Sequence, residues 1–240
     1  TTHLLQALRE TATPCTIVAV TTDKVYHNLE THHAYEETDR LGGIDPYSAS
    51  KAGSELVINS FRSLFDQEDL PIKIASARAG NVIGGGDWCE NRLIPDIARA
   101  LSNGQSVETR SPAAVRPWQH VLEPLAGYLM LAERLSHDAT FADAFNFGPN
   151  PSDNRTVEDV IKTALQTWPG TYHARGEAKA PHEAGLLRLS IEKARTQLGW
   201  EPKWNFDTAV EKTMTWYKSV HAGTDSLGMT LSQINTFTNP

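Results

Sequence analysis

The sequence is poor in cysteine, in basic charge and in long apolar runs. Cys15 and Cys89 are its two cysteines in 240 residues, which gives neither a disulfide framework nor the spacing of metal ligands. We therefore expect no metal site and a reducing compartment, the cytoplasm. His32 and His33 lie in a polar stretch, where we expect them to be solvated rather than to bind a metal.

Two further absences exclude whole classes of function. No apolar run approaches the roughly 20 residues that a membrane-spanning helix needs, so we expect no membrane interaction. The formal net charge of −7, without a basic stripe, argues against general nucleic-acid binding. An anionic small molecule would have to be bound by locally placed arginines.

What the sequence does contain is an alternation of helix and strand patterns that predicts an α/β protein. Residues 3–10 are typical of a helix, 13–22 of a buried parallel strand, 24–45 of a polar loop and 72–80 of a second buried strand before a glycine-rich turn. With the helix that begins after Asp45, these segments predict a βαβ unit with a right-handed crossover. Further helices are expected near 92–103, 120–136, 156–168, 191–198 and 206–221, with short strands near 144–148 and 186–190.

The helix after Asp45 carries a tyrosine and a lysine one turn apart. Asp45 can cap this helix, and Pro46 suits its first position. Tyr47 and Lys51 then share a face, and an ammonium near a phenol stabilises the phenolate. The pair is therefore either catalytic or an ordinary part of an amphipathic helix.

The neighbouring motifs favour the catalytic interpretation. In an open parallel sheet, ligands lie beyond the carboxyl ends of the strands. Thr22, Asp23 and Lys24 follow the first strand, and Asn81 follows the second, where Arg78 could be structural. We expect hydroxyl, carboxyl, ammonium and phenol groups to meet at this edge of the sheet.

At the level of whole motifs, the chain resembles the extended short-chain dehydrogenase/reductase family and, within it, the CDP-glucose 4,6-dehydratases. The resemblance covers residues 1–221 and rests on eight strings in order: TTDKVY, YSASK, RAGNVIGGGDW, RLIPDI, RPWQHVLEPLAGYL, FNFGP, PHEAGLLRLS and LGWEPKW. It implies a Rossmann-like fold. Residues 1–90 would be the remainder of the NAD-binding domain, to which 143–148 returns, and 91–240 would mainly form a smaller α/β domain that binds the nucleotide sugar.

The resemblance also implies a reaction and a cofactor. NAD would oxidise C4 of CDP-glucose, water would be lost across C5 and C6, and the hydride would return to C6, giving CDP-4-keto-6-deoxyglucose for deoxysugar biosynthesis. Tyr47 would be the base at the C4 hydroxyl, Lys51 would lower its pKa and hold the nicotinamide ribose, and Thr22 would hydrogen-bond near the C4 oxygen. Asp23 would be the acid that protonates the leaving C6 hydroxyl. Lys24 would be either the base at C5 or a cation that stabilises the enolate.

Four residues are implied for nucleotide-sugar binding: Asn81, Arg92, Arg116 and His182. An arginine fork suits a diphosphate, because it makes charge-assisted and often bidentate contacts. Taken alone, Arg92 could equally form a surface salt bridge, and His182 could be a structural histidine. The family also implies a homodimer or homo-oligomer that pairs through two long helices, one of them carrying Tyr47.

Family members carry about a hundred further residues upstream, with the glycine-rich loop that binds the NAD pyrophosphate. The glycines at 84–86 do not fit that loop. We therefore expect the 240-residue chain alone to hold no NAD and to show no turnover, and Ile58, Phe61 and Phe65 to be partly uncovered. Two alternatives to the dehydratase remain: a nucleotide-sugar epimerase of the same superfamily, which needs no acid such as Asp23, and a catalytically silent binding or pairing module.

Overall fold

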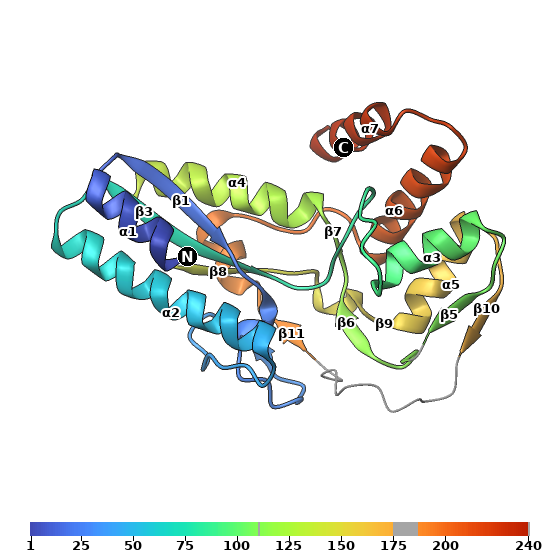
Figure 1. Cartoon of the computed structure of the whole chain (residues 1–240), viewed down its shortest axis with the longest axis horizontal. Helices are drawn as coiled ribbons and strands as arrows, with labels where there is room; N and C mark the ends of the chain where they lie inside the picture. The colour runs from blue at the N-terminus through green and yellow to red at the C-terminus, as the bar shows by residue number, and fades with distance from the viewer. Residues whose placement is uncertain (110, 175–186, 240) are drawn as a thin grey trace. The chain divides into compact units, whose positions relative to one another are not determined.

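The computed structural model describes residues 1–109, 111–174 and 187–239, which form two compact units (Figure 1). Unit 1 consists of Thr1–Gly80, Pro124–Gly148 and Leu187–Glu201. Unit 2 consists of Asn81–Glu123, Pro149–Leu186 and Pro202–Pro240. The chain therefore leaves each unit and returns to it twice.

A three-stranded parallel sheet forms the centre of unit 1. Its order is β1 (Cys15–Val20), β3 (Ile72–Ala79) and β8 (Ala144–Phe147). Strand β3 is central, with Cys15 opposite Ile72 on one side and Ser76 opposite Ala144 on the other. This parallel sheet confirms the predicted α/β class and the pairing of the two strands that flank the Tyr47 helix.

Helices cover both faces of this sheet. Ile72 and Ile74 of β3 pack with Leu5 of α1 (Thr2–Thr11) and Ile58 of α2 (Pro46–Gln67). The alternate residues, such as Ala75, pack instead with α4 (Leu122–His137) and the π-helical turn Ala194–Leu198. Because side chains alternate along a strand, the even-numbered residues of β3 face α2.

The start of α2 is as the sequence predicts. A side-chain oxygen of Asp45 accepts the N–H of Ser48 at 3.0 Å, and Pro46 is at the first helical position. The predicted exposure of its apolar residues is wrong for two of the three. Ile58 and Phe65 are each 1% exposed, because α1 and β3 of the same chain cover them. Phe61 is half-buried.

Two other local predictions need correction. Strand β1 is present but not buried, since it has one neighbour in the described sheet and Val20 is 52% exposed. The expected polar loop contains a 3-10 turn, Asp23–Val25, and β2 (Ala34–Tyr35), which pairs in parallel with β11 (Arg188–Leu189). Val25, Tyr26 and Tyr35 of this stretch form one buried cluster with Ala52 of α2, whereas Leu29 and Ile44 are exposed.

Unit 2 is built on helices with short two-stranded pairings. Its helices are α3 (Leu93–Ser102), α5 (Val157–Thr167), α6 (Phe206–His221) and α7 (Ser226–Thr238). Its strand pairs are β4 (Val82–Ile83) with β7 (Gln119–His120), β5 (Val107–Thr109) with β10 (Tyr172–Ala174), and β6 (Val115–Pro117) with β9 (Asn154–Thr156). A 3-10 turn of unit 2 lies at Pro151–Asp153, and another, Ala139–Phe141, belongs to unit 1.

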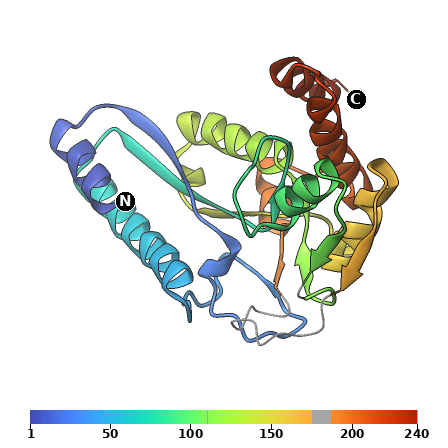
Figure 2. The ribbon, with the colours of Figure 1, turned by 45° about the vertical axis from the view of Figure 1, so that its right-hand side comes forward.

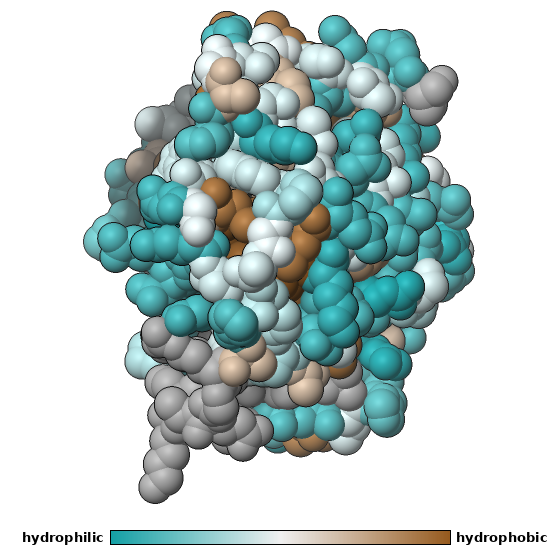
Figure 3. All heavy atoms as spheres, turned by 90° about the vertical axis from the view of Figure 1, so that its right-hand side faces the viewer, coloured by the Kyte–Doolittle hydropathy of each residue, from teal (hydrophilic) through white to brown (hydrophobic). Residues whose placement is uncertain are grey.

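In unit 2, α3, α5 and α6 pack together (Figure 2). The core lies between them, where residues such as Ile97, Ile161 and Val210 are fully buried. On the side of these helices the surface is largely hydrophilic, with small apolar areas near its centre (Figure 3). Across the described parts of the chain, no helix has the length and apolar character needed to cross a membrane.

Helix α7 was not predicted, because its sequence, SLGMTLSQINTFT, is uncharged and rich in residues of modest helix propensity. Its cap and its packing explain it. Asp225 accepts the N–H of Gly228 at 2.6 Å, and the Phe237 ring packs edge-on to Trp204 with centroids 5.0 Å apart. Tertiary contacts thus compensate for a weak local signal.

Candidate active site

The segment that follows β1 turns back immediately and buries two polar residues. Thr22 caps the 3-10 turn: its Oγ1 accepts the N–H of Lys24 at 3.4 Å and lies 3.1 Å from Asp23 Oδ1. Thr22 is 7% exposed and Asp23 is 2% exposed. The predicted acid is therefore buried, beside the Thr22 hydroxyl.

The first turn of α2 brings the phenol to this segment. Lys24 Nζ lies 6.0 Å from the centroid of the Tyr47 ring, and Tyr47 is 52% exposed. Hydrogen bonds from Ser48 hold the pKa of Asp45 below its usual value, and the Lys24 ammonium adds to the effect. Lys51 lies one turn after Tyr47 on the same helix. The structure thus brings Thr22, Asp23, Lys24 and Tyr47 together within unit 1.

Gly43 explains why the loop before α2 can approach so closely. A Cβ at this position would lie 2.4 Å from the Ala49 backbone nitrogen and 2.5 Å from Ser48 Cβ. Any side chain here would push against the first turn of α2. The glycine therefore lets the loop pack against the first turn of α2, which carries Tyr47.

The residues predicted to bind the nucleotide sugar belong to unit 2. The Asn81 carbonyl accepts the N–H of Gln119 at 3.1 Å, next to the pairing of β4 with β7. Arg92 Nη1 lies 3.0 Å from Asp87 Oδ2, which is the surface salt bridge considered as its alternative. Arg116 lies on β6 directly opposite Arg155 of β9. His182 lies outside the described residues.

The glycine-rich turn after β4 serves close packing. A Cβ on Gly85 would lie 2.1 Å from the Trp216 ring of α6, and the Tyr217 hydroxyl donates to the Asp87 carbonyl at 2.5 Å. The glycines of this turn are therefore explained by close packing against α6. This agrees with the observation that their spacing does not fit a phosphate-binding loop.

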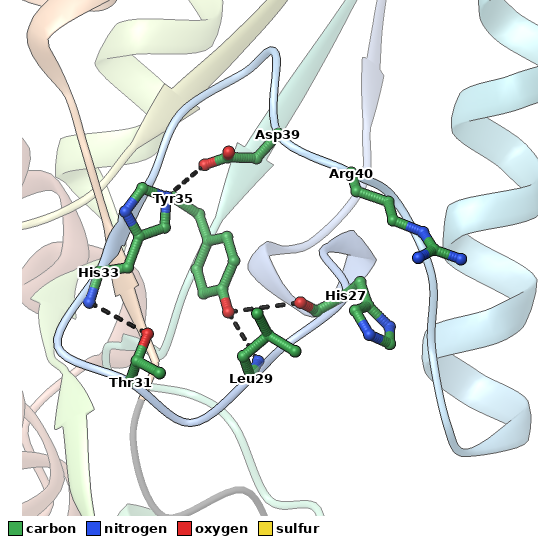
Figure 4. A pocket seen from close by; sticks show the side chains of 7 residues that line it. All are labelled: His27, Leu29, Thr31, His33, Tyr35, Asp39 and Arg40. Carbon is green, nitrogen blue, oxygen red and sulfur yellow. Dashed lines mark hydrogen bonds and ion pairs between the residues drawn. The ribbon is translucent and has the colours of Figure 1, made fainter.

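A separate hollow of about 380 Å³ lies in the loop after the 3-10 turn (Figure 4). Tyr35 lines it, and its hydroxyl accepts from the Leu29 N–H at 2.8 Å, while Arg40 points away from Tyr35. His33 is half exposed and pairs with Asp39 at 2.7 Å. None of the predicted catalytic residues lines this hollow. The candidate site is therefore located by the grouping of Thr22, Asp23, Lys24 and Tyr47, and not by the shape of the surface.

Glu55, four residues after Lys51 on α2, was not predicted as a residue of this site. This carboxylate is 3% exposed and pairs with the buried Arg78 at 2.9 Å. A signal was present, since Tyr47, Lys51 and Glu55 recur at intervals of four on one helix and therefore share a face.

Comparison with known proteins identifies the family of the chain. The family described as GDP-mannose 4,6 dehydratase matches residues 1–213. The chain belongs to this family. It is 41% identical to the CDP-glucose 4,6-dehydratase of Salmonella typhimurium over 244 residues, which cover 99% of this chain and 68% of that enzyme.

Two solved structures share the fold. The dTDP-glucose 4,6-dehydratase of Bacillus anthracis in complex with NAD matches with a TM-score of 0.76 and 22% identity, over 92% of this chain and 67% of that one. The UDP-glucuronic acid 4-epimerase of Bacillus cereus matches with a TM-score of 0.78 and 15% identity, over 91% and 66%. The chain thus spans about two thirds of each relative.

Proposed function

We propose that this chain carries the catalytic residues of an NAD-dependent lyase that converts CDP-glucose to CDP-4-keto-6-deoxyglucose. The observation that carries the proposal is the 41% identity to a CDP-glucose 4,6-dehydratase over 99% of the chain. The grouping of a buried carboxyl, an ammonium and a half-exposed phenol supports it. An epimerase would have no use for the buried acid.

The described residues fit the nicotinamide end of NAD. Tyr47 is 52% exposed at the start of α2, and Lys51 follows on the same helix. Lys51 would hold the nicotinamide ribose, with Tyr47 and Thr22 beside it. When bound, NAD takes a hydride from C4 of the sugar and returns it to C6.

The first proton transfer uses Tyr47. Its phenolic oxygen accepts the proton of the C4 hydroxyl as that carbon is oxidised. The Thr22 hydroxyl orients the C4 oxygen by a hydrogen bond. The product of this step is a C4 ketone.

The ketone makes elimination of water possible. The C5 proton becomes acidic, the C6 hydroxyl is β to the carbonyl, and the electron pair of the C5–H bond forms the C5–C6 double bond as the C6–O bond breaks. Asp23 gives its proton to the departing hydroxyl, which leaves as water. Lys24 acts either as a neutral base that takes the C5 proton and gives a proton back to C5 when the hydride returns to C6, or as a cation that stabilises the enolate while a base in exchange with solvent takes and returns that proton.

Nucleotide-sugar binding is assigned to Asn81, Arg92, Arg116 and His182. Arg92 would exchange the Asp87 carboxylate for a diphosphate oxygen, because its side chain is 65% exposed and can turn. We further propose a cytoplasmic homodimer that pairs through α1 and α2, on which Leu4 and Leu56 are each 62% exposed.

The test is a comparison of substrates with the protein at its full natural length. Purified protein with NAD is incubated with CDP-glucose, dTDP-glucose, UDP-glucose or GDP-mannose. The sugar nucleotides are then separated by chromatography, and their masses are measured by mass spectrometry. We expect loss of 18 mass units from CDP-glucose with the highest kcat/KM of the four. An unchanged mass with a new C4 epimer would identify an epimerase. No turnover of any substrate would support the silent module.

A further inference from the structure

The candidate catalytic segment is held at both ends by one buried ion pair. Thr22, Asp23 and Lys24 lie between Thr21 and Tyr26. Thr21 and Tyr26 both contact the pair formed by Glu55 of α2 and Arg78 of β3. All of these residues belong to unit 1.

Glu55 makes the connection to Thr21. Its Oε1 accepts the Thr21 hydroxyl at 2.5 Å, and its Oε2 accepts from Ser76 Oγ at 2.8 Å and Arg78 Nη2 at 2.9 Å. The side chain is 3% exposed. One carboxylate on the Tyr47 helix thus joins the end of β1 to the centre of the sheet.

Arg78 makes the connection to Tyr26. Its Nη1 donates to the Tyr26 hydroxyl at 2.9 Å and to the Glu37 carbonyl at 3.1 Å. Its guanidinium carbon lies 5.1 Å from the Tyr26 ring centroid. The Tyr26 hydroxyl in turn donates to Asn146 Oδ1 at 2.7 Å, which ties the same residue to β8.

The pair is charged despite its burial. Burial alone would raise the pKa of Glu55, but the hydrogen bonds from Arg78, Thr21 and Ser76 outweigh it and lower that pKa. Burial likewise opposes the charge of Arg78, and its bonds to Glu55 and Tyr26 raise its pKa. Replacing a buried ion pair by well-packed apolar residues is often neutral or stabilising. Stability alone is therefore a weak explanation of the pair between Glu55 and Arg78.

We propose that Glu55 and Arg78 are positioning residues, whose ion pair holds the segment 22–24 in register with Tyr47. Neither residue needs to touch the substrate. Glu55 lies two turns after Tyr47 on α2, so the pair links the position of the phenol directly to that of Asp23. The catalytic consequence rests on the proposed function, whereas the ordering of the segment does not.

The test uses Thr21→Val and Glu55→Gln in the protein at its full natural length with NAD. Thr21→Val removes the hydroxyl bonded to Glu55 but leaves the ion pair, and Glu55→Gln removes the charge. Thr16→Val, at an exposed position of β1, and Glu68→Gln, in the exposed ion pair with Arg9, are the matched controls.

We expect the amide hydrogens of residues 22–26 to exchange about tenfold faster in both test variants, as the loss of a hydrogen bond to a charged group implies. The kcat for CDP-glucose should fall by a similar factor with KM nearly unchanged, and the controls should match the wild type. A merely structural role would instead accelerate exchange throughout unit 1 and lower kcat only as far as the folded fraction falls.

Wild-type exchange at residues 22–26 in Thr21→Val would overturn the proposal, as would an unchanged kcat in a folded Glu55→Gln protein. Thr21→Val decides the question if Glu55→Gln does not fold. If the wild-type protein has no dehydratase activity, the proposed function fails by itself, and the exchange measurement still decides whether the ion pair orders the segment.

Discussion

The Lys24 ammonium lies 6.0 Å from the centre of the Tyr47 ring, although the two residues come from different elements. Lys24 is in the turn after β1, and Tyr47 is in the first turn of α2. The contact joins the two halves of the proposed chemistry: the phenol that acts at C4 and the segment that acts at C5 and C6.

Tyr47→Phe tests the first of these steps. The variant removes the proton acceptor but little volume, and the hydroxyl belongs to a half-exposed side chain, so stability should not change. We expect oxidation at C4 to slow by a hundredfold or more, as is typical for the loss of a general base. Stopped-flow absorbance should then show no transient reduced cofactor. Tyr128→Phe is the control, and near-normal oxidation by Tyr47→Phe would refute the assignment.

Asp23→Asn should separate the two steps. The amide cannot protonate the leaving hydroxyl, whereas the base at C4 is untouched. We expect reduced cofactor to form and remain, with little release of the 4-keto-6-deoxy product. Single-turnover mixing with quenched product analysis measures both. Product release at the wild-type rate would mean that another group protonates the hydroxyl, and Asp66→Asn, on the exposed part of α2, controls for the charge change.

Two glycines near the same helix should respond in opposite directions to alanine. Gly43→Ala places a methyl group against Ser48 and Ala49, so it should destabilise the protein by about 1–3 kcal/mol and lower kcat. Around Gly53 of α2, no described neighbour outside the helix backbone lies within 4 Å of the added methyl group. Gly53→Ala should therefore stabilise by about 0.5–1 kcal/mol. Urea unfolding measures both, and equal effects would contradict the close approach of the loop to α2.

A buried histidine predicts loss of stability in mild acid. His120 is 1% exposed, and burial, with the nearby Lys212 ammonium, lowers its pKa to about 4. Its unfolded pKa is about 6.5, so the unfolded state binds more protons between these values. Stability is therefore lost as the pH falls through this window, by on the order of 3 kcal/mol in full.

His120→Asn isolates this contribution. Its Oδ1 can replace His120 Nδ1 as the acceptor for the Leu122 N–H, now at 3.3 Å, but it does not titrate. Urea unfolding at pH 7 and pH 5 should show a smaller loss of stability in His120→Asn than in the wild type. His3→Asn, at an exposed position, should behave as the wild type does. An equal loss in all three proteins would show that other groups account for the acid sensitivity.

The sequence predicts the local elements of this fold well where periodicity, capping and composition agree. The helix from Pro46 is the clearest case, because Asp45, Pro46 and the buried spacing of Ile58 and Phe65 all indicate it. Helix α7 has no such agreement, and its formation depends on Trp204 and Trp216, which lie earlier in the chain. The burial of Tyr26 and Tyr35 was missed because it depends on pairing with β11, about 150 residues further along the chain.

The residues of the candidate site also differ in how far the sequence predicts them. Residues at the ends of strands and in the first turn of a helix follow from motif and topology, as Thr22 and Tyr47 do. The spacing of Glu55 after Lys51 indicates that Glu55 shares a face of α2 with Lys51 and Tyr47. Its pairing with Arg78 could not be predicted, because that pairing depends on the even-numbered residues of β3 facing α2. The sites of Asn81, Arg92, Arg116 and His182 on a bound substrate remain predictions.

The most direct test of the proposed chemistry is a single reaction in deuterium oxide. CDP-glucose is converted by the protein at its full natural length with NAD, and the product is examined by proton NMR. Removal of the C5 proton by a base that exchanges with solvent, followed by return of the original C4 hydrogen to C6, predicts deuterium at C5 and a C6 methyl group that carries three protons. A product that keeps its C6 hydroxyl and has no deuterium at C5 would contradict a 4,6-dehydratase and identify epimerisation at C4 instead.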